Sequence, residues 1–186
     1  VMGHEFCGEI AELGRKTPKS LRAGMTVVSF PLVRAHGGVH LTGLSPLAPG
    51  GYAQQVVAEA SMSFVVPNGL PSEIAALTEP MSVALHAVRR SEVNKRDTAI
   101  VLGCGPVGLA VICQLKARGV GTIVASDFSA ARRALATRCG ADVVVNPAVE
   151  SPYGKASGKG VLTEVPALYE LAMSSMEKLT RLPGWQ

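Results

Sequence analysis

The chain has 186 residues, of which 47% are hydrophobic and only 17% are charged. This length suits one domain or two small ones, and the composition excludes an intrinsically disordered chain. The 18 basic and 14 acidic residues leave a net charge of +4, and basic residues form pairs but no longer run, so we expect no nucleic-acid surface. No apolar stretch approaches the roughly 18 residues of a membrane span, and the amino end has no leader pattern; we expect a cytoplasmic protein without membrane contact.

The four cysteines lie far apart in the sequence, at Cys7, Cys104, Cys113 and Cys139. None belongs to the two-residue-spaced pairs of a structural zinc knuckle. A chain of this size and composition does not need disulfides. We therefore expect free cysteines that serve as small hydrophobic side chains, with only Cys104 close to a site of chemistry.

The first ninety residues are punctuated by glycine and proline and contain short β-type runs. These runs are 26–30, 53–57 and 63–66, and they predict an irregular β domain. Residues 31–51 show no periodicity and predict a long loop. A helix is predicted from Pro80 to the basic pair that ends at Arg90. Its apolar face comprises Met81, Ala84, Leu85 and Val88.

A different pattern follows a polar hinge at 91–97. Strands are predicted at 98–102, 122–126 and 142–145, and helices at 106–118 and 129–139. Strands that alternate with helices are typical of parallel βαβ units. A loop rich in Gly, Ser and Lys then leads to Pro166, which opens a predicted amphipathic helix.

The first of these strands ends in a glycine turn, Gly103-Cys-Gly105-Pro-Val-Gly108, that opens a helix. In this context the first glycine allows a tight turn, the second lets the backbone approach a pyrophosphate, and the third lets helix pack on strand. The anion then meets the N-terminus of the helix, including Pro106 and Val107. The turn predicts a dinucleotide site.

Asp127 ends the second strand, where a carboxylate accepts hydrogen bonds from both ribose hydroxyls of a dinucleotide. A 2′-phosphate would be repelled there, so we expect NAD(H) rather than NADP(H). Arg132 and Arg133 open the next helix and either lie along the adenosine or remain solvated surface charges. An arginine near that ribose weakens the exclusion of NADP(H).

His4 and Glu5 stand at the start of the chain, and Glu79 stands where the helix with His86 begins. Imidazole and carboxylate are both zinc donors, and a catalytic zinc takes three protein ligands. Neighbouring residues on a regular strand point to opposite faces, so His4 and Glu5 both bind only if Gly3 or a bulge breaks the pleat. Spacing alone favours a hydrogen-bonded structural role for these residues over a metal site.

Four segments occur in the order found in zinc-dependent medium-chain alcohol and polyol dehydrogenases, which residues 1 to about 147 resemble. They are Gly-His-Glu-Phe-Cys-Gly-Glu-Ile at 3–10, Gly-Tyr-Ala-Gln-Gln-Val-Val at 51–57, Glu-Pro-Met-Ser-Val-Ala-Leu-His-Ala at 79–87 and Val-Leu-Gly-Cys-Gly-Pro-Val-Gly at 101–108. The resemblance implies an α/β chain. A partial GroES-like irregular β domain at 1–90 precedes an incomplete doubly wound parallel sheet, the first half of a Rossmann NAD-binding domain, at 91–147.

By resemblance, His4, Glu5 and Glu79 are the catalytic residues and ligate one catalytic zinc, and His86 packs its helix. The family's zinc is a Lewis acid toward the oxygen of a small alcohol, whose hydride passes to NAD; in reverse it polarises a carbonyl. The resemblance also implies a homo-oligomeric parent protein, with a subunit number that the sequence does not give.

The chain departs from the family in three places. The family's cysteine ligand lies upstream of Gly-His-Glu, and no structural zinc is predicted because residues 31–51 hold no cysteine. Only the first three strands of a dinucleotide domain are found. The segment 148–186 reads as an insertion or tail. We therefore expect a fragment of a longer parent, with weak zinc binding and impaired turnover.

Two other readings remain open. A zinc-free quinone or enoyl reductase of the same superfamily has the same glycine turn, although His4 and Glu79 argue against it. A non-catalytic nucleotide-binding module needs no metal at all.

Overall fold

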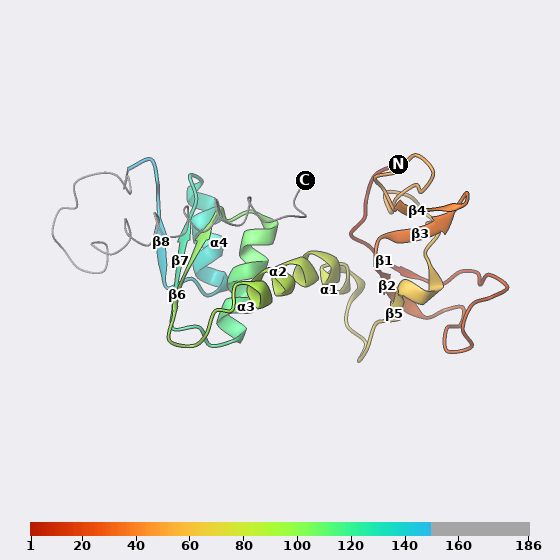
Figure 1. The fold of residues 1–186 in the computed structure, drawn as a ribbon, viewed down its shortest axis with the longest axis horizontal. Coiled ribbons are helices and arrows are strands. Elements are labelled where there is room, and N and C mark those ends of the chain that lie inside the picture. The colour runs from red at the N-terminus through yellow and green to blue at the C-terminus, as the bar shows by residue number, and fades with distance from the viewer. Residues whose placement is uncertain (150–186) are drawn as a thin grey trace. The chain divides into compact units, whose positions relative to one another are not determined.

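The computed structural model describes residues 1–149, which fall into two compact units (Figure 1). The first unit is Val1–Val83 and the second begins at Ala84. Helix α2 (Thr78–Arg90) runs through this division, and the domain boundary expected at residue 90 stays a prediction. The helix expected at Pro166 lies outside the described residues. Within the described part, no helix has the length and apolar character to cross a bilayer.

The first unit contains an antiparallel sheet of three short strands, β1 (Cys7–Glu9), β2 (Thr26–Ser29) and β5 (Ser63–Val65), in the order β1-β2-β5. A 3-10 turn, η1 (Ala60–Met62), precedes β5, and helix α1 (Ser72–Ala75) precedes α2. The predicted strands around 26–30 and 63–66 are confirmed.

The strand expected at 53–57 is wrong, because residues 53–58 have no strand structure. Val57 is 75% exposed, and among the described residues no strand pairs with this run. A β-type run becomes a strand only where a neighbouring ladder receives its backbone groups. In this unit, residues 50–52, which precede the run, donate their N–H groups to the carbonyls of residues 1–3.

The long loop expected at 31–51 contains a β-hairpin of β3 (Leu32–Ala35) and β4 (Gly38–Leu41). Ala35 pairs with Gly38, so only His36 and Gly37 form the connection. Both have positive φ, 50° at His36 and 75° at Gly37, as a type I′ turn requires. The sequence signal was weak, because histidine rarely fills the first position of such a turn.

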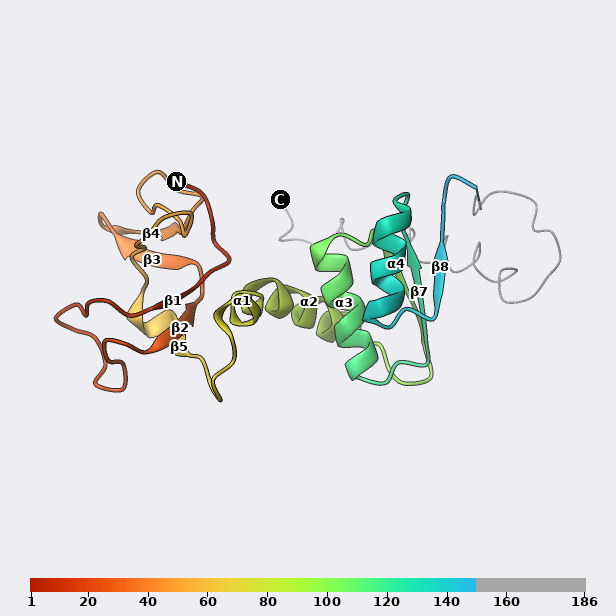
Figure 2. The same ribbon diagram turned by 180° about the vertical axis from the view of Figure 1, so that it is seen from behind.

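In the second unit, β6 (Thr98–Leu102), β7 (Thr122–Ser126) and β8 (Val143–Val145) form a parallel sheet in that order. Helices α3 (Pro106–Ala117) and α4 (Ala130–Cys139) lie on the same face of the sheet, as Figures 1 and 2 show from opposite sides. The predicted βαβαβ order is confirmed, and it is the first half of a Rossmann fold.

A continuous apolar core lies between this sheet and its helices. Ile112 from α3 and Ile123 from β7 are fully buried, and Val101 from β6 is 8% exposed. Burying a side chain of this size contributes roughly 1.5–3 kcal/mol. Because β6 and β7 are parallel and in register from Thr98 with Thr122 to Leu102 with Ser126, the residues that follow them meet at one edge. Gly103 and Asp127 are those residues.

Candidate functional site

The glycine turn after β6 has the geometry that its three glycines predict. Gly103 adopts φ of 90°, a conformation that is costly for other residues, and its N–H donates to the carbonyl of Ser126 at 2.8 Å. An added Cβ on Gly108 would collide with the carbonyl oxygen of Gly103, a backbone atom that cannot rotate away. The first and third glycines therefore hold the strand end against the helix start.

The second glycine serves the opposite purpose. Gly105 is the N-cap of α3 with extended backbone, and an added Cβ there meets no atom within 4 Å. Pro106 follows in the first turn, where a missing N–H costs nothing, and Val107 is half exposed. The turn thus leaves open space in front of a helix N-terminus, which favours an anion.

Cys104 does not contribute a reactive thiol to this turn. Its side chain is fully buried, and burial raises the pKa of the thiol. The other three cysteines are half-buried, and all four are free.

Asp127 is built into the turn by backbone hydrogen bonds that the sequence did not reveal. One carboxylate oxygen accepts from Ser129 N at 2.7 Å and the other from Cys104 N at 2.8 Å. The two N–H groups, the Ser129 one first, hold the pKa of the Asp127 carboxyl below its usual range. Each oxygen has a second lone pair, so the ionised group can still accept from a ribose hydroxyl.

The two arginines that follow have different environments. Arg133 donates from Nη1 to the carbonyls of Asp127 and Phe128, at 2.8 and 2.9 Å. It therefore holds the turn between β7 and α4. Arg132 lies 3.9 Å from the Asp127 carboxylate with a side chain that is 58% exposed, which leaves its other donors available to a ligand.

In the first unit, His4, Glu5 and Glu79 come together. Each offers one ligand atom, and these atoms lie within 4.8 Å of one another. No other group of three such side chains gathers in this way among residues 1–149. His86 is not part of it and is exposed on α2 rather than packed. Glu79 is more than seventy residues from His4 and Glu5 in the sequence, so only folding joins it to them.

The local backbone explains how adjacent residues share one site. Gly3 adopts φ of 104°, and Glu5 sits at a bend before β1 begins at Cys7. The alternation of a regular strand is therefore broken, as the sequence required for both side chains to converge. Glu79 comes from the first turn of α2, which begins two residues before the predicted start at Pro80.

This donor set fits zinc. One imidazole and two carboxylates match the three-ligand pattern of catalytic zinc sites, which keep a fourth position open. Zn–N and Zn–O bonds of about 2.0–2.2 Å place ligand atoms roughly 3.4 Å apart in a tetrahedral site, so modest side-chain rotations close the remaining separation. Glu5 is exposed while His4 and Glu79 are half-buried, which leaves one side of the cluster accessible.

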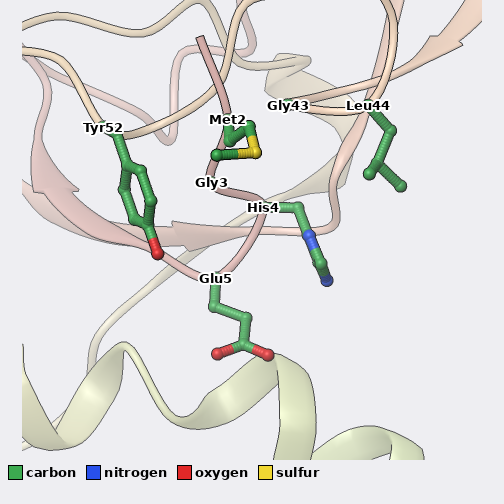
Figure 3. A pocket seen from close by; sticks show the side chains of 7 residues that line it. All are labelled: Met2, Gly3, His4, Glu5, Gly43, Leu44 and Tyr52. Carbon is green, nitrogen blue, oxygen red and sulfur yellow. The ribbon is translucent and has the colours of Figure 1, made fainter.

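A pocket of about 330 Å³ adjoins His4 and Glu5 (Figure 3). Its other lining residues, which the sequence did not single out, are Met2, Gly3, Gly43, Leu44 and Tyr52. In Figure 3 the side chains of His4 and Glu5 extend away from Met2, while Tyr52 and Leu44 lie on either side. The pocket joins the candidate metal ligands to largely apolar walls.

Comparisons with known proteins show which proteins the chain is similar to. Residues 1–68 match the family model of the alcohol dehydrogenase GroES-like domain. The chain is 37% identical to the (R,R)-butanediol dehydrogenase of Bacillus subtilis, in an alignment that spans 94% of this chain and 55% of that protein. The chain thus spans about half the length of the curated relatives it matches.

Solved structures show the same fold. The crystal structure of 2R,3R-butanediol dehydrogenase from Bacillus subtilis matches with a TM-score of 0.72 at 35% identity, covering 90% of this chain and 48% of that one. A protein of Sinorhizobium meliloti described as a zinc-binding dehydrogenase and bound to NADP matches with a TM-score of 0.76 at 25% identity, covering 87% and 50%. By sequence and by fold, the chain is similar to about half of these alcohol and polyol dehydrogenases, and its residues 1–68 match the GroES-like domain of alcohol dehydrogenases.

Proposed function

We propose that this chain supplies the metal site and the dinucleotide site of a zinc-dependent oxidoreductase that transfers a hydride between a small alcohol or polyol and NAD(H). The observation that carries the proposal is the convergence of His4, Glu5 and Glu79 within 4.8 Å. A dinucleotide-binding module without metal chemistry has no need to join these three residues.

The roles of the residues follow from their positions. His4, Glu5 and Glu79 would hold the metal, with His4 and Glu79 half-buried and Glu5 exposed. When bound, zinc supplies a Lewis acid for the alcohol or carbonyl oxygen. Met2, Leu44 and Tyr52 line the pocket beside the ligands with exposed side chains and offer a largely apolar surface to the carbon skeleton of a substrate. The glycine turn and Asp127 hold the cofactor by its pyrophosphate and ribose.

We further propose that NAD(H) is preferred over NADP(H). The Asp127 carboxylate is kept ionised by Ser129 N–H and Cys104 N–H, so it repels a 2′-phosphate at neutral pH. Arg133 is already engaged with two backbone carbonyls, and only Arg132 is available to offset that repulsion. A similar protein bound to NADP makes the comparison of both cofactors a necessary part of the test. Calorimetric titration with each cofactor measures the preference directly, and tighter binding of NADP(H) would reverse it.

Zinc binding to variants of the 186-residue chain tests the metal site. We expect the chain to bind one zinc weakly at this site, and a further loss of zinc affinity of at least tenfold in His4→Ala and in Glu79→Gln. Glu73→Gln is the matched control, because Glu73 is an exposed carboxylate on α1 outside the cluster. Competition with a chromogenic chelator gives the affinities.

The activity assay follows NAD-dependent oxidation of a short diol and of a polyol, with and without a chelator. Oxidation that disappears on chelation and returns with zinc supports the proposal. NAD binding together with zinc affinity that is unchanged in His4→Ala and Glu79→Gln contradicts it, and leaves the non-catalytic nucleotide-binding module. Chelator-resistant reduction of a quinone or enoyl substrate would instead indicate the zinc-free branch of the superfamily.

A further inference from the structure

Residues 50–52 lie directly against the first three residues of the chain. Gly50 N donates to the carbonyl of Val1 at 2.9 Å, Gly51 N to that of Gly3 at 2.8 Å, and Tyr52 N to that of Met2 at 3.0 Å. Three consecutive N–H groups therefore hold the backbone that leads into His4. This contact was not visible in the sequence, where the two segments are almost fifty residues apart.

The contact is too close for side chains. A Cβ added to Gly50 would lie 2.5 Å from the carbonyl oxygen of Met2 and closer still to that of Gly3. A Cβ added to Gly43 would lie 2.6 Å from the carbonyl oxygen of Gly3 and 2.8 Å from its carbon. Real Cβ contacts are essentially never under 3.0 Å, and these neighbours are backbone atoms, so they cannot move aside by a change of rotamer. We call the meeting of Gly3, Gly43 and Gly50 the glycine crossing.

At Gly50, glycine is required because the glycine crossing leaves no room for a side chain. Gly3 and Gly43 have φ of 104° and 76°, which already favour glycine, but Gly50 is outside the positive-φ region. Its φ does not require glycine, and a side chain is excluded by the nearby backbone of Met2, Gly3 and Gly43.

The crowded carbonyl of Gly3 belongs to the peptide bond that connects Gly3 to His4. This peptide is planar, so a rotation about the Cα–C bond of Gly3 that moves its oxygen away from Gly50 also moves the N and Cα of His4. The direction of the imidazole toward Glu79 depends on that Cα. Ligand atoms have to be held within about 0.5 Å of their productive positions for tight binding.

We propose that Gly50 and Gly43 are positioning residues for the metal site, since they fix the peptide that aims His4. This inference rests on the proposed zinc site of His4, Glu5 and Glu79. The two glycines are not ligands. They affect metal affinity by fixing the position of the backbone at His4, and they do not contact the metal.

Gly50→Ala in the 186-residue chain tests the proposal, with Gly8→Ala as its matched control. Gly8 lies in β1 of the same unit, has no positive φ, and an added Cβ there meets nothing within 4 Å. We expect Gly50→Ala to weaken zinc binding by about 10–100-fold, the range found for residues that orient ligands. We expect Gly8→Ala to stay within a factor of two, and NAD affinity to be unchanged in both.

Cobalt(II) provides a readout that a merely structural effect does not change. Its visible absorption is strong in a tetrahedral site and weak in an octahedral one, so folded Gly50→Ala saturated with cobalt should lose intensity relative to Gly8→Ala. Equal zinc affinities and equal cobalt spectra in two folded variants would overturn the proposal.

Gly51→Ala covers the case in which Gly50→Ala does not fold. An added Cβ there meets the Phe6 Cβ at 3.0 Å and ring atoms at 3.3 and 3.4 Å, which is a milder contact than the one at Gly50. Its zinc affinity should fall between those of Gly50→Ala and Gly8→Ala, and a value equal to that of Gly8→Ala would count against the proposal. If the unchanged chain binds zinc but Glu79→Gln does not weaken it, the proposed function fails; if Glu79→Gln weakens it and Gly50→Ala does not, only the present inference fails.

Discussion

The two units both build a site on close backbone contacts between glycines, but over different distances along the chain. In the second unit Gly103 and Gly108 meet within a single turn, and Asp127 follows on the neighbouring strand. In the first unit Gly3, Gly43 and Gly50 meet across a loop and a hairpin. The first arrangement is a local motif, and the second depends on the fold of a whole unit. Substitutions should therefore have separable consequences in the two sites.

The largest effect is expected from Gly108→Ala, which breaks the local arrangement. The added Cβ meets the carbonyl of Gly103, so β6 and α3 have to separate. We expect the free energy of unfolding to fall by roughly 1–3 kcal/mol, together with a loss of NAD affinity. Urea denaturation followed by circular dichroism, and calorimetric titration with NAD, measure the two effects.

Gly105→Ala is the control for that change. It is the same substitution in the same turn, but the added Cβ enters open space. Stability should be retained while NAD affinity decreases, because the methyl group occupies the approach of the pyrophosphate. An equal loss of stability in both variants would show that close packing is not what Gly108 provides.

A smaller effect is expected from Asp127→Asn, which tests the polar part of the same turn. The asparagine amide has one acceptor oxygen for the two N–H groups of Cys104 and Ser129, so one of them faces an N–H donor. The variant should unfold at lower urea concentration at pH 7 and bind NAD more weakly.

The pH dependence follows from the lowered pKa of Asp127. A carboxyl whose pKa is lower folded than unfolded adds stability above its ordinary value of 3.8, and that stability is lost as the pH falls through the folded pKa. The difference in free energy of unfolding between the original chain and Asp127→Asn should therefore be constant near neutral pH and become smaller below about pH 4. Urea midpoints measured between pH 2 and pH 7 test this, and a difference that grows in acid would contradict it.

The smallest effect is expected from Lys116→Met. Lys116 pairs with Asp142 at 3.3 Å, but the two side chains are 54% and 38% exposed, and the Asp142 pKa is lowered first by the Ile123 N–H and only then by Lys116. Loss of the pair should cost about 0.5 kcal/mol or less and should vanish at high salt. A larger, salt-independent loss would contradict the assignment of this contact as a weak surface ion pair.

The sequence predicted what is encoded locally. Strands 98–102 and 122–126 and the turn at Gly103 were found because apolar runs, glycine and helix periodicity occur next to one another. The hairpin around His36 was missed because its turn lacks the usual Asn-Gly or Asp-Gly signal. The run 53–57 was misread because its propensity was judged without knowing whether a partner strand existed.

For the candidate metal site, the sequence predicted the three ligand residues. It also predicted that Gly3 or a bulge must break the strand alternation before His4 and Glu5 can both bind. It supplied neither the approach of Gly50 to Gly3 nor the pocket walls at Leu44 and Tyr52, which are contacts between distant segments. The carboxylate of Asp127 was predicted from its place after a strand, but its two N–H donors were not, because they depend on the register of β6 with β7.

The contact between residues 1–3 and 50–52 has a consequence for the order of assembly. The contact closes a loop of almost fifty residues, and this costs conformational entropy before the contact can stabilise the unit. The glycine turn at 103–108 closes within a few residues and costs less entropy. During folding, the nucleotide turn should therefore become protected from hydrogen exchange before the amides of Gly50, Gly51 and Tyr52 do. Metal ions would then be captured late, by a segment that is secured only when the rest of its unit is in place.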